Sequence, residues 1–315
     1  MINEVEKFLL KYEIQNTPVV LGFSSGPDSC ALAIILNQLK VKYNLDIILA
    51  YFNHGWREEA RLEENFTVDF AKNNFLKCYI EKAPENSIKT EEVARDLRYA
   101  FFDKVAKEYN SQYVFLAHNK NDNIETLIYR VIKGTSFKGL TSIPERRDIY
   151  YRPLLNVEKK DILTFLSENN QKYMFDSSNE DVKYRRNLIR KEILPIFEKI
   201  NPSYISNIEN LIKTSISTKE IVDEVLDKFK KQILFDNSFD RQKYILASKS
   251  LRYEFLNDFV GPKLKYRNYK NIKKFDDFIL ENTNSQISVN KELFLKIKKN
   301  KIYYIENKNY EDSNG

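Results

Sequence analysis

The sequence is poor in cysteine and has no long apolar run. Its two cysteines, Cys30 and Cys78, are far apart and form no CxxC motif. This pattern argues against a disulfide framework, a structural zinc site or a cysteine-ligated cluster, and it suits a reducing compartment. No apolar stretch approaches the roughly 20 residues needed to span a bilayer. The first residues lack the basic start and long apolar core of a signal peptide. We therefore expect a soluble, cytoplasmic protein with no membrane partner.

The composition allows a packed core. Apolar residues make up 42% of the 315 residues, with 21 Phe and 20 Tyr, which argues against wholesale disorder. This length suffices for two domains of ordinary size. The net charge of +6 is compatible with a surface that binds RNA or phosphate, but many ordinary globular proteins are equally basic.

The first two hundred residues alternate between short apolar runs and longer amphipathic segments. Runs of strand length occupy residues 18–23, 45–53, 77–83 and 112–118, and a helical pattern follows each of them. Residues 144–155 predict a hairpin that ends in a fifth strand. This alternation predicts an α/β fold with a doubly wound, mostly parallel five-stranded sheet of Rossmann-like type.

Helical patterns dominate after the predicted hairpin. A long amphipathic stretch covers residues 204–234, and short strands return near residues 285–307. We predict a helical linker followed by a small α+β C-terminal domain. The predicted domains are residues 1–214, which include the helical extension, and residues 215–315.

The segment SSGPDS joins the first predicted strand directly to a helix. Free backbone N–H groups at a helix start favour an anion, most simply a phosphate. Serine hydroxyls can donate to phosphate oxygens, whereas a carboxylate beside a phosphate needs a cation such as Mg²⁺ between them. A helix capped by Ser and Asp, with no ligand, explains the isolated segment at least as well. The predicted phosphate loop comprises Ser24, Ser25, Gly26, Pro27, Asp28 and Ser29.

The only two histidines, His54 and His118, both fall at the carboxyl ends of predicted parallel strands. In an open α/β sheet these ends line the ligand crevice. A lone histidine is more often structural than catalytic. Two histidines at neighbouring crevice positions favour a function.

Seven further motifs follow the loop in order. The segment SSGPDS is similar to the SGGxDS loop of the N-type ATP pyrophosphatases, and Ser25 stands where that family has its first glycine. A Cβ at this position raises a steric question for a bound pyrophosphate. The motifs are FNHGWR, EEVARDLRYAFF, LAHNKNDNIETLIYRVIKG, SFKGL, YYRPLL, MFDSSN and YRRNLIRKEILP. With these motifs, the chain resembles over residues 15–200 the tRNA(Ile)-lysidine synthetases of that superfamily.

The resemblance implies an ATP- and Mg²⁺-dependent reaction on tRNA(Ile) with a CAU anticodon. The 2-carbonyl oxygen of the wobble cytidine attacks the α-phosphate of ATP and releases pyrophosphate. The ε-amine of free L-lysine then displaces AMP and gives lysidine. The first predicted domain would be catalytic and the second would bind tRNA. The sequence leaves open whether the chain forms a homodimer.

The resemblance also implies roles for single residues. Asp28 would bind Mg²⁺, and Asp122 would bind the same metal or orient lysine. Glu125 would receive the lysine ammonium group or take its proton, and His118 would stabilise the α-phosphate. Asp122 and Glu125 have plain alternatives as carboxylates on an ordinary helix. The remaining residues expected at the nucleotide are Asn53, which replaces the family's usual Asp, and His54 and Arg95.

Basic residues are expected to contact the tRNA. The segment KYRRNLIRK would flank the anticodon loop, and KLKYRNYKNIKK in the C-terminal domain mixes cations with aromatic side chains suited to RNA. Either segment is also compatible with a solvated surface. The predicted RNA-binding residues are Arg98, Lys183, Arg185, Arg186, Arg190, Lys263, Lys265 and Arg267.

Three other functions are weighed against this one. A tRNA 2-thiocytidine enzyme also adenylates a cytidine, but it needs paired cysteines that this chain lacks. An amide-forming ligase for a small metabolite does not explain the basic segments. A degenerate tRNA-binding protein of the same fold is motivated by Ser25 and Asn53, and nucleotide binding would separate it from the enzymes.

Overall fold

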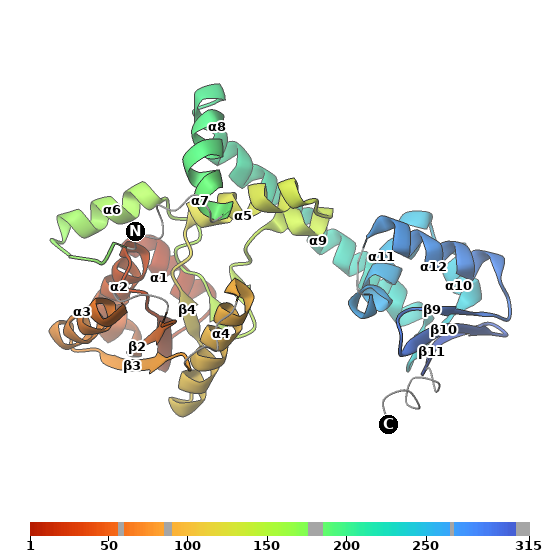
Figure 1. Ribbon diagram of the computed structural model, residues 1–315, viewed down its shortest axis with the longest axis horizontal. Coiled ribbons are helices and arrows are strands. Elements are labelled where there is room, and N and C mark those ends of the chain that lie inside the picture. The colour runs from red at the N-terminus through yellow and green to blue at the C-terminus, as the bar shows by residue number, and fades with distance from the viewer. Residues whose placement is uncertain (56–59, 85–89, 176–184, 265–267, 307–315) are drawn as a thin grey trace. The chain divides into compact units, whose positions relative to one another are not determined.

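The computed structural model describes residues 1–55, 60–84, 90–175, 185–264 and 268–306. It divides into two compact units, Met1–Ile216 and Ser217–Gly315 (Figure 1). The predicted division between residues 214 and 215 lies in the same helix, α9 (Tyr204–Ile233), as the observed one. Among the described residues, no helix is long and apolar enough to cross a membrane.

A six-stranded sheet forms the centre of the first unit, in the order β3-β2-β1-β4-β6-β5. All neighbouring pairs are parallel except β5 and β6, which form the predicted hairpin. The predicted doubly wound, mostly parallel sheet is confirmed, and the first arm of the hairpin adds a sixth strand at its edge. The strands are β1 (Thr17–Gly22), β2 (Leu45–Asn53), β3 (Lys77–Lys82), β4 (Val114–Leu116), β5 (Arg146–Arg147) and β6 (Tyr150–Tyr151).

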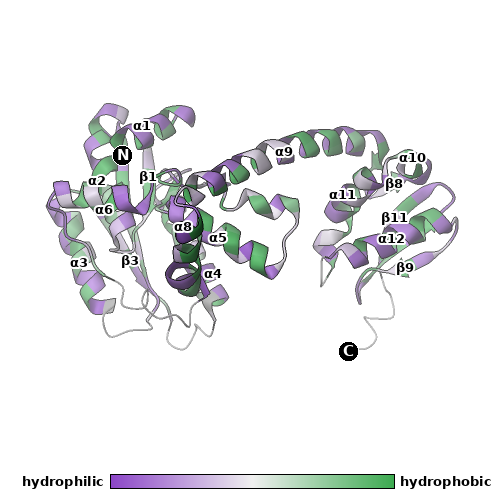
Figure 2. Cartoon of the chain, turned by 90° about the horizontal axis from the view of Figure 1, so that it is seen from above, coloured by the Kyte–Doolittle hydropathy of each residue, from purple (hydrophilic) through white to green (hydrophobic). Residues whose placement is uncertain are grey.

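Both faces of this sheet are buried, which explains its nearly continuous apolar strands. Val19 and Leu21 of β1 point into one core, whereas Val20 between them points into the other. The first core also contains residues of α1, α2, α3 and α6, and the second contains residues of α4. Figure 2 shows hydrophilic and hydrophobic residues alternating along these helices. Their bounds are α1 (Ile2–Lys11), α2 (Pro27–Tyr43), α3 (Ala60–Asn73), α4 (Glu91–Glu108) and α6 (Lys159–Glu168).

A third, smaller core joins α5 (Lys120–Lys133) to the helices that follow the sheet. Ile124 of α5 packs there with Ile189 and Leu194. Ile189 belongs to a single π-helical turn, an uncommon geometry that is often found at functional sites. The other elements here are the 3₁₀ helix η1 (Phe137–Thr141), α7 (Arg185–Leu188), the π-turn η3 (Ile189–Ile193) and α8 (Leu194–Ile200).

The second unit combines helices with an antiparallel sheet in the order β7-β8-β11-β10-β9. The predicted α+β character of this region is therefore confirmed. A buried hydrogen-bonded group supports its core, because the Asp276 carboxylate accepts from both Tyr244 and Arg252. The elements are β7 (Leu234–Phe235), β8 (Ser238–Asp240), α10 (Arg241–Leu246), α11 (Lys249–Phe259), η4 (Gly261–Lys263), α12 (Tyr269–Glu281), β9 (Gln286–Ser288), β10 (Leu293–Lys298) and β11 (Lys301–Glu306).

Candidate functional site

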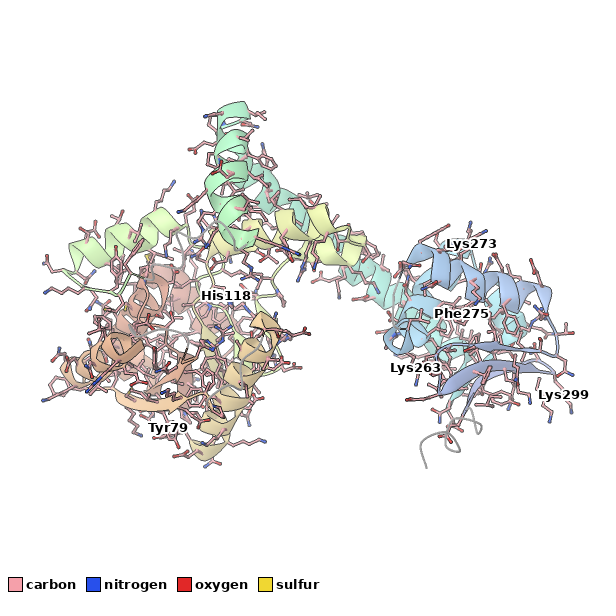
Figure 3. All side chains as sticks on the ribbon, viewed as in Figure 1. Tyr79, His118, Lys263, Lys273, Phe275 and Lys299 are labelled. Atoms are coloured by element: carbon pink, nitrogen blue, oxygen red, sulfur yellow. The ribbon has the colours of Figure 1, made fainter. Side chains whose placement is uncertain are left out.

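A cavity of about 330 Å³ opens at the carboxyl ends of β1, β2 and β4. This volume falls in the range of small-molecule sites, and its place is where open α/β sheets bind ligands. The structure brings both histidines and the predicted phosphate loop to this one cavity. Figure 3 shows His118 within the first unit. The predicted site residues that line it are Ser24, Asp28, Ser29, Asn53, His54, Arg98 and His118.

Ser25 has the left-handed backbone conformation, with φ of +59°, that a glycine adopts without strain. Its side chain is fully buried and points toward α3, where its hydroxyl lies 2.8 Å from that of Thr67. The same hydroxyl donates to the backbone carbonyl of Glu63 at 3.3 Å. The Ser25 hydroxyl is therefore engaged with α3, and its Cβ does not crowd the cavity. The predicted phosphate contact from this hydroxyl does not fit the geometry.

The other loop serines hold the start of α2 in shape. Ser29 Oγ accepts from the Ser24 backbone N–H at 3.2 Å and donates to the Gly26 carbonyl at 3.0 Å. Gly26 is the N-cap residue, so it has no side chain to cap the helix, and Pro27 begins the first turn. The alternative of a helix capped by its own Ser or Asp is not what the structure shows. The N-terminus of α2 instead faces the cavity with its partial positive charge.

Asp28 is the carboxylate nearest to this loop. Its Oδ1 accepts a hydrogen bond from Asn119 Nδ2 at 3.1 Å, and both of its oxygens lie 2.8 Å from Lys159 Nζ. Burial raises the pKa of Asp28, while Lys159 opposes that shift. Neither partner was predicted from the sequence. Asn119 directly follows His118 in the sequence, so its place in the site could have been predicted. Lys159 belongs to α6, and nothing near it in the sequence indicated a contact with Asp28.

Asp122 closes the first turn of α5. Asn119 and Asp122 form a reciprocal capping box, in which each side chain accepts from the other's backbone N–H at 3.0 Å. The second carboxylate oxygen of Asp122 lies 3.7 Å from Arg190. Asp122 thus has the helix-capping role expected as its plain alternative, and it lies beside the other carboxylates of the site.

Glu125 lies one turn further along α5 and is only 2% exposed. Arg190 binds it with two hydrogen bonds, from Nε to Oε1 at 2.7 Å and from the guanidinium Nη2 to Oε2 at 3.0 Å. Burial raises the pKa of Glu125, and Arg190 opposes this. Arg190 was predicted to contact RNA. This prediction needs correction, because the guanidinium group of Arg190 is paired with the buried carboxylate of Glu125.

His118 is held in its neutral form. Burial is the largest cause, and nearby arginines add to it, so that the pKa of His118 falls to about 3. Its Nδ1 is buried with no hydrogen-bond partner among the described residues. A neutral imidazole can donate one hydrogen bond and accept another, but it supplies no positive charge. The charge around it comes from Arg95, Arg98, Arg152 and Arg186.

Of the remaining predicted residues, Asn53 lines the cavity, whereas Arg185 and Lys263 do not. The Asn53 amide donates to Glu64 at 2.6 Å, and its oxygen accepts from the Gly55 N–H. Arg185 is exposed and donates to the Tyr129 hydroxyl at 3.2 Å. Lys263 of the second unit lies over the Tyr304 ring, and Figure 3 shows it well apart from Lys273 and Lys299 on that unit. The predicted RNA contacts Lys183, Lys265 and Arg267 lie outside the described residues.

The carboxylates here suit a cation that arrives with phosphates. Among the residues that the structure describes, no three His, Cys, Asp or Glu side chains are grouped to hold a metal ion alone. Mg²⁺ commonly binds through one or two carboxylates together with substrate phosphates and waters. Asp28, with Asp122 close enough to raise its pKa, fits that arrangement.

Comparison with known families identifies the fold. A model of the PP-loop domain matches residues 1–197. The chain belongs to the PP-loop family. This assignment agrees with the loop at residues 24–29 and with the strand order of this PP-loop protein. The expected resemblance to this superfamily is confirmed.

Among curated proteins, this PP-loop chain is similar to tRNA(Ile)-lysidine synthases. It is 33% identical over 262 residues to the one from Thermosipho africanus, covering 78% of this chain and 61% of that protein. It is 31% identical over 276 residues to the one from Parabacteroides distasonis, covering 84% and 62%. The aligned region thus spans about three fifths of the length of these two relatives.

Solved structures that share the fold of this PP-loop protein include a tRNA-modifying enzyme. It is the U34-tRNA thiolase NcsA from Methanococcus maripaludis with its [4Fe-4S] cluster, with a TM-score of 0.54 and 18% identity. The likeness covers 67% of this chain and 77% of the thiolase. At this identity it supports the fold and nothing finer.

Proposed function

We propose that this protein is a tRNA(Ile)-lysidine synthetase. It would use ATP to join L-lysine to the wobble cytidine of a CAU-anticodon tRNA(Ile), with release of pyrophosphate and AMP. The observation that carries the proposal is the cavity in which the PP-loop, with Asp28, meets His54 and His118. Asp122 acts electrostatically on both Asp28 and Glu125, so these carboxylates form one charged group beside it. The similarity to synthases of that name supports the choice of substrate. A tRNA substrate would place the reaction in the cytoplasm.

The loop and its surroundings would bind the nucleotide. The N-terminus of α2 and the hydroxyl of Ser24 would hold the β- and γ-phosphates. Asp28 and Asp122 would hold Mg²⁺, which neutralises charge that develops on the phosphates. A neutral His118 would donate a hydrogen bond to an α-phosphate oxygen, and Arg95 and Arg98 would supply positive charge there.

Glu125 of α5 would receive lysine. The ammonium group of lysine would lie against the Glu125 carboxylate, where the Arg190 guanidinium lies now. Glu125 can then accept a proton from the ammonium group, because burial raises its pKa. A deprotonated amine is required before lysine can attack the adenylated cytidine.

RNA contacts would come from both units. The predicted contacts of the first unit are Arg98, Lys183, Arg185 and Arg186, and those of the second are Lys263, Lys265 and Arg267. Arg186 contributes to the positive potential at His118 and at Glu125, so it is placed to meet a phosphate near the reacting base. The homodimer stays a prediction.

A reaction with purified components tests the proposal. The protein is incubated with ATP, Mg²⁺, radiolabelled lysine and a CAU-anticodon tRNA(Ile) transcript. We expect label in the tRNA and an equal amount of AMP. If neither lysine incorporation nor AMP release occurs, the proposal is wrong, and binding of tRNA alone would then favour the degenerate RNA-binding protein.

Two variants test the carboxylate roles. Asp28→Ala and Asp122→Ala should abolish lysine incorporation while leaving tRNA affinity largely unchanged. Lys160→Ala changes an exposed side chain on the helix that also carries Lys159, and it serves as a control with normal turnover. Near-normal activity of either aspartate variant would refute the role assigned to that residue.

A further inference from the structure

The ammonium group of Lys159 lies where a cation would bind Asp28. Its Nζ is 2.8 Å from both carboxylate oxygens, and the third contact of the carboxylate is the Asn119 amide. Both side chains are partly shielded, with 34% of the lysine side chain and 25% of the aspartate side chain exposed. A cation held by two oxygens at this distance is a strong, charge-assisted contact.

The structure holds Lys159 in this place from several sides. Lys159 is the first residue of α6, and its backbone N–H donates to Asn121 Oδ1 of α5 at 2.9 Å. Helix α6 packs against α2, which carries Asp28. The neighbouring Lys160 is turned away, since its side chain is 76% exposed and pairs with Glu158 at 2.9 Å. The contact with Asp28 is therefore particular to Lys159.

We propose that Lys159 occupies the divalent-cation position on Asp28 in the nucleotide-free protein. The cation would then bind only together with a nucleoside triphosphate. This inference rests on the proposed function, because it takes Asp28 as a metal contact. Lys159 acts here as a positioning residue that keeps the carboxylate ordered and closed to free metal.

Electrostatic repulsion explains why Lys159 would keep a free divalent cation from Asp28. Asp28 has a single negative charge, and a divalent cation brought beside the Lys159 ammonium group would meet a like charge at short range. A triphosphate adds several negative charges and further oxygen ligands, so that it can draw the metal to Asp28 and release the lysine. Since linked equilibria are reciprocal, removal of the Lys159 charge should strengthen metal binding without nucleotide.

The test measures binding of Mn²⁺, a spectroscopic substitute for Mg²⁺, to the full chain without ATP, by the loss of the free-ion electron paramagnetic resonance signal. Lys159→Gln removes the charge but keeps a hydrogen-bond donor for Asp28. Lys160→Gln is the matched control, with the same loss of charge one residue away. We expect Lys159→Gln to bind Mn²⁺ about tenfold or more tightly than the wild type and the control.

Equal Mn²⁺ affinities for the three proteins would overturn the inference. A lower melting temperature of Lys159→Gln at unchanged Mn²⁺ affinity would also overturn it, since Lys159 would then be a structural contact only. Should that variant fail to fold, Lys159→Arg keeps the charge and should bind Mn²⁺ as weakly as the wild type. Tighter binding by this second variant contradicts the inference.

A parallel titration separates this inference from the proposed function. Failure of the wild-type protein to bind Mn²⁺ together with ATP would count against the nucleotide site itself. Binding of Mn²⁺ and ATP by the wild type, with equal free-Mn²⁺ affinities in the variants, would count against the role of Lys159 alone.

Discussion

At residue 25 a serine takes a backbone conformation that favours glycine. The left-handed φ costs a residue with a Cβ about 1 kcal/mol. The hydrogen bond between its buried hydroxyl and that of Thr67 stabilises the folded state by about the same free energy. The conformation thus persists because α3 offers a polar partner, and this partner also turns the side chain away from the cavity.

Substitutions at this position should therefore rank in an unusual order. Ser25→Gly loses the hydrogen bond but relieves the backbone, whereas Ser25→Ala loses the hydrogen bond and keeps the strain. We expect Ser25→Gly to be more stable than Ser25→Ala by about 1 kcal/mol in urea-induced unfolding. Both should bind ATP like the wild type. A more stable alanine variant would show that the backbone is unstrained.

His118 should make the protein sensitive to acid. Its pKa of about 3 in the folded protein lies below the ordinary value of 6.5, so the unfolded chain binds a proton there while the folded chain does not. Stability is therefore lost as the pH falls below 6.5. His118→Gln should reduce the slope of unfolding free energy between pH 6 and pH 5 by about 1 kcal/mol per pH unit. An unchanged slope would mean that His118 is protonated in the folded protein.

Helix α5 and the π-turn η3 act together as one element of the site. The first turns of α5 carry Asp122 and Glu125, and the π-turn directs Arg190 onto both. Such a turn is rare and is frequently found at functional sites. Here it brings a guanidinium group to a carboxylate that would otherwise be buried without a cation.

Removal of that guanidinium group should destabilise the first unit. Arg190→Met leaves the Glu125 carboxylate buried and unpaired, so the free energy of unfolding should fall by about 3 kcal/mol. In a double-mutant cycle with Glu125→Gln, the two losses should not add, and the coupling should exceed about 1 kcal/mol.

Arg185→Met is the matched control for this cycle. Arg185 is exposed and its side chain donates to the hydroxyl of Tyr129, so its loss should cost less than about 0.5 kcal/mol. Additive losses for Arg190 and Glu125 would show that the pair contributes nothing beyond its separate groups.

For the whole molecule, the proposed binding of tRNA depends on the distribution of positive charge. The chain carries 51 Lys and Arg against 45 Asp and Glu, a modest excess, so its placement matters more than its size. Joint replacement of Lys263, Lys265 and Arg267 by alanine should reduce the slope of log affinity against log salt by about two for tRNA binding. The measurement is filter binding of a tRNA transcript across a range of salt concentrations.

A second triple variant controls for net charge. Lys7, Lys72 and Lys107 are exposed on α1, α3 and α4, and none of them lines the cavity. Their joint replacement should leave the slope unchanged. An equal effect of the two triple variants would mean that only net charge matters, and the predicted contact surface of the second unit would be wrong.

Much of the fold could be predicted from the sequence, because strands buried on both faces must be apolar throughout. The four apolar runs and the hairpin at residues 144–155 all became strands of the observed sheet. The antiparallel edge strand β5 was not counted among the five predicted strands, because its residues Arg146 and Arg147 are exposed and polar. The π-turn was not predicted either, since over so few residues it has the same apolar spacing as an ordinary helix.

The sequence by itself determined the PP-loop, the strand ends that carry His54 and His118, and the family to which the chain belongs. These features depend on local order along the chain, where small and polar residues follow an apolar strand. Only the tertiary structure decided which charges meet: Lys159 with Asp28, Arg190 with Glu125, and the Ser25 hydroxyl with Thr67. The partners in these pairs are separated by 131, 65 and 42 residues, and only the packing of helices brings them within hydrogen-bond distance.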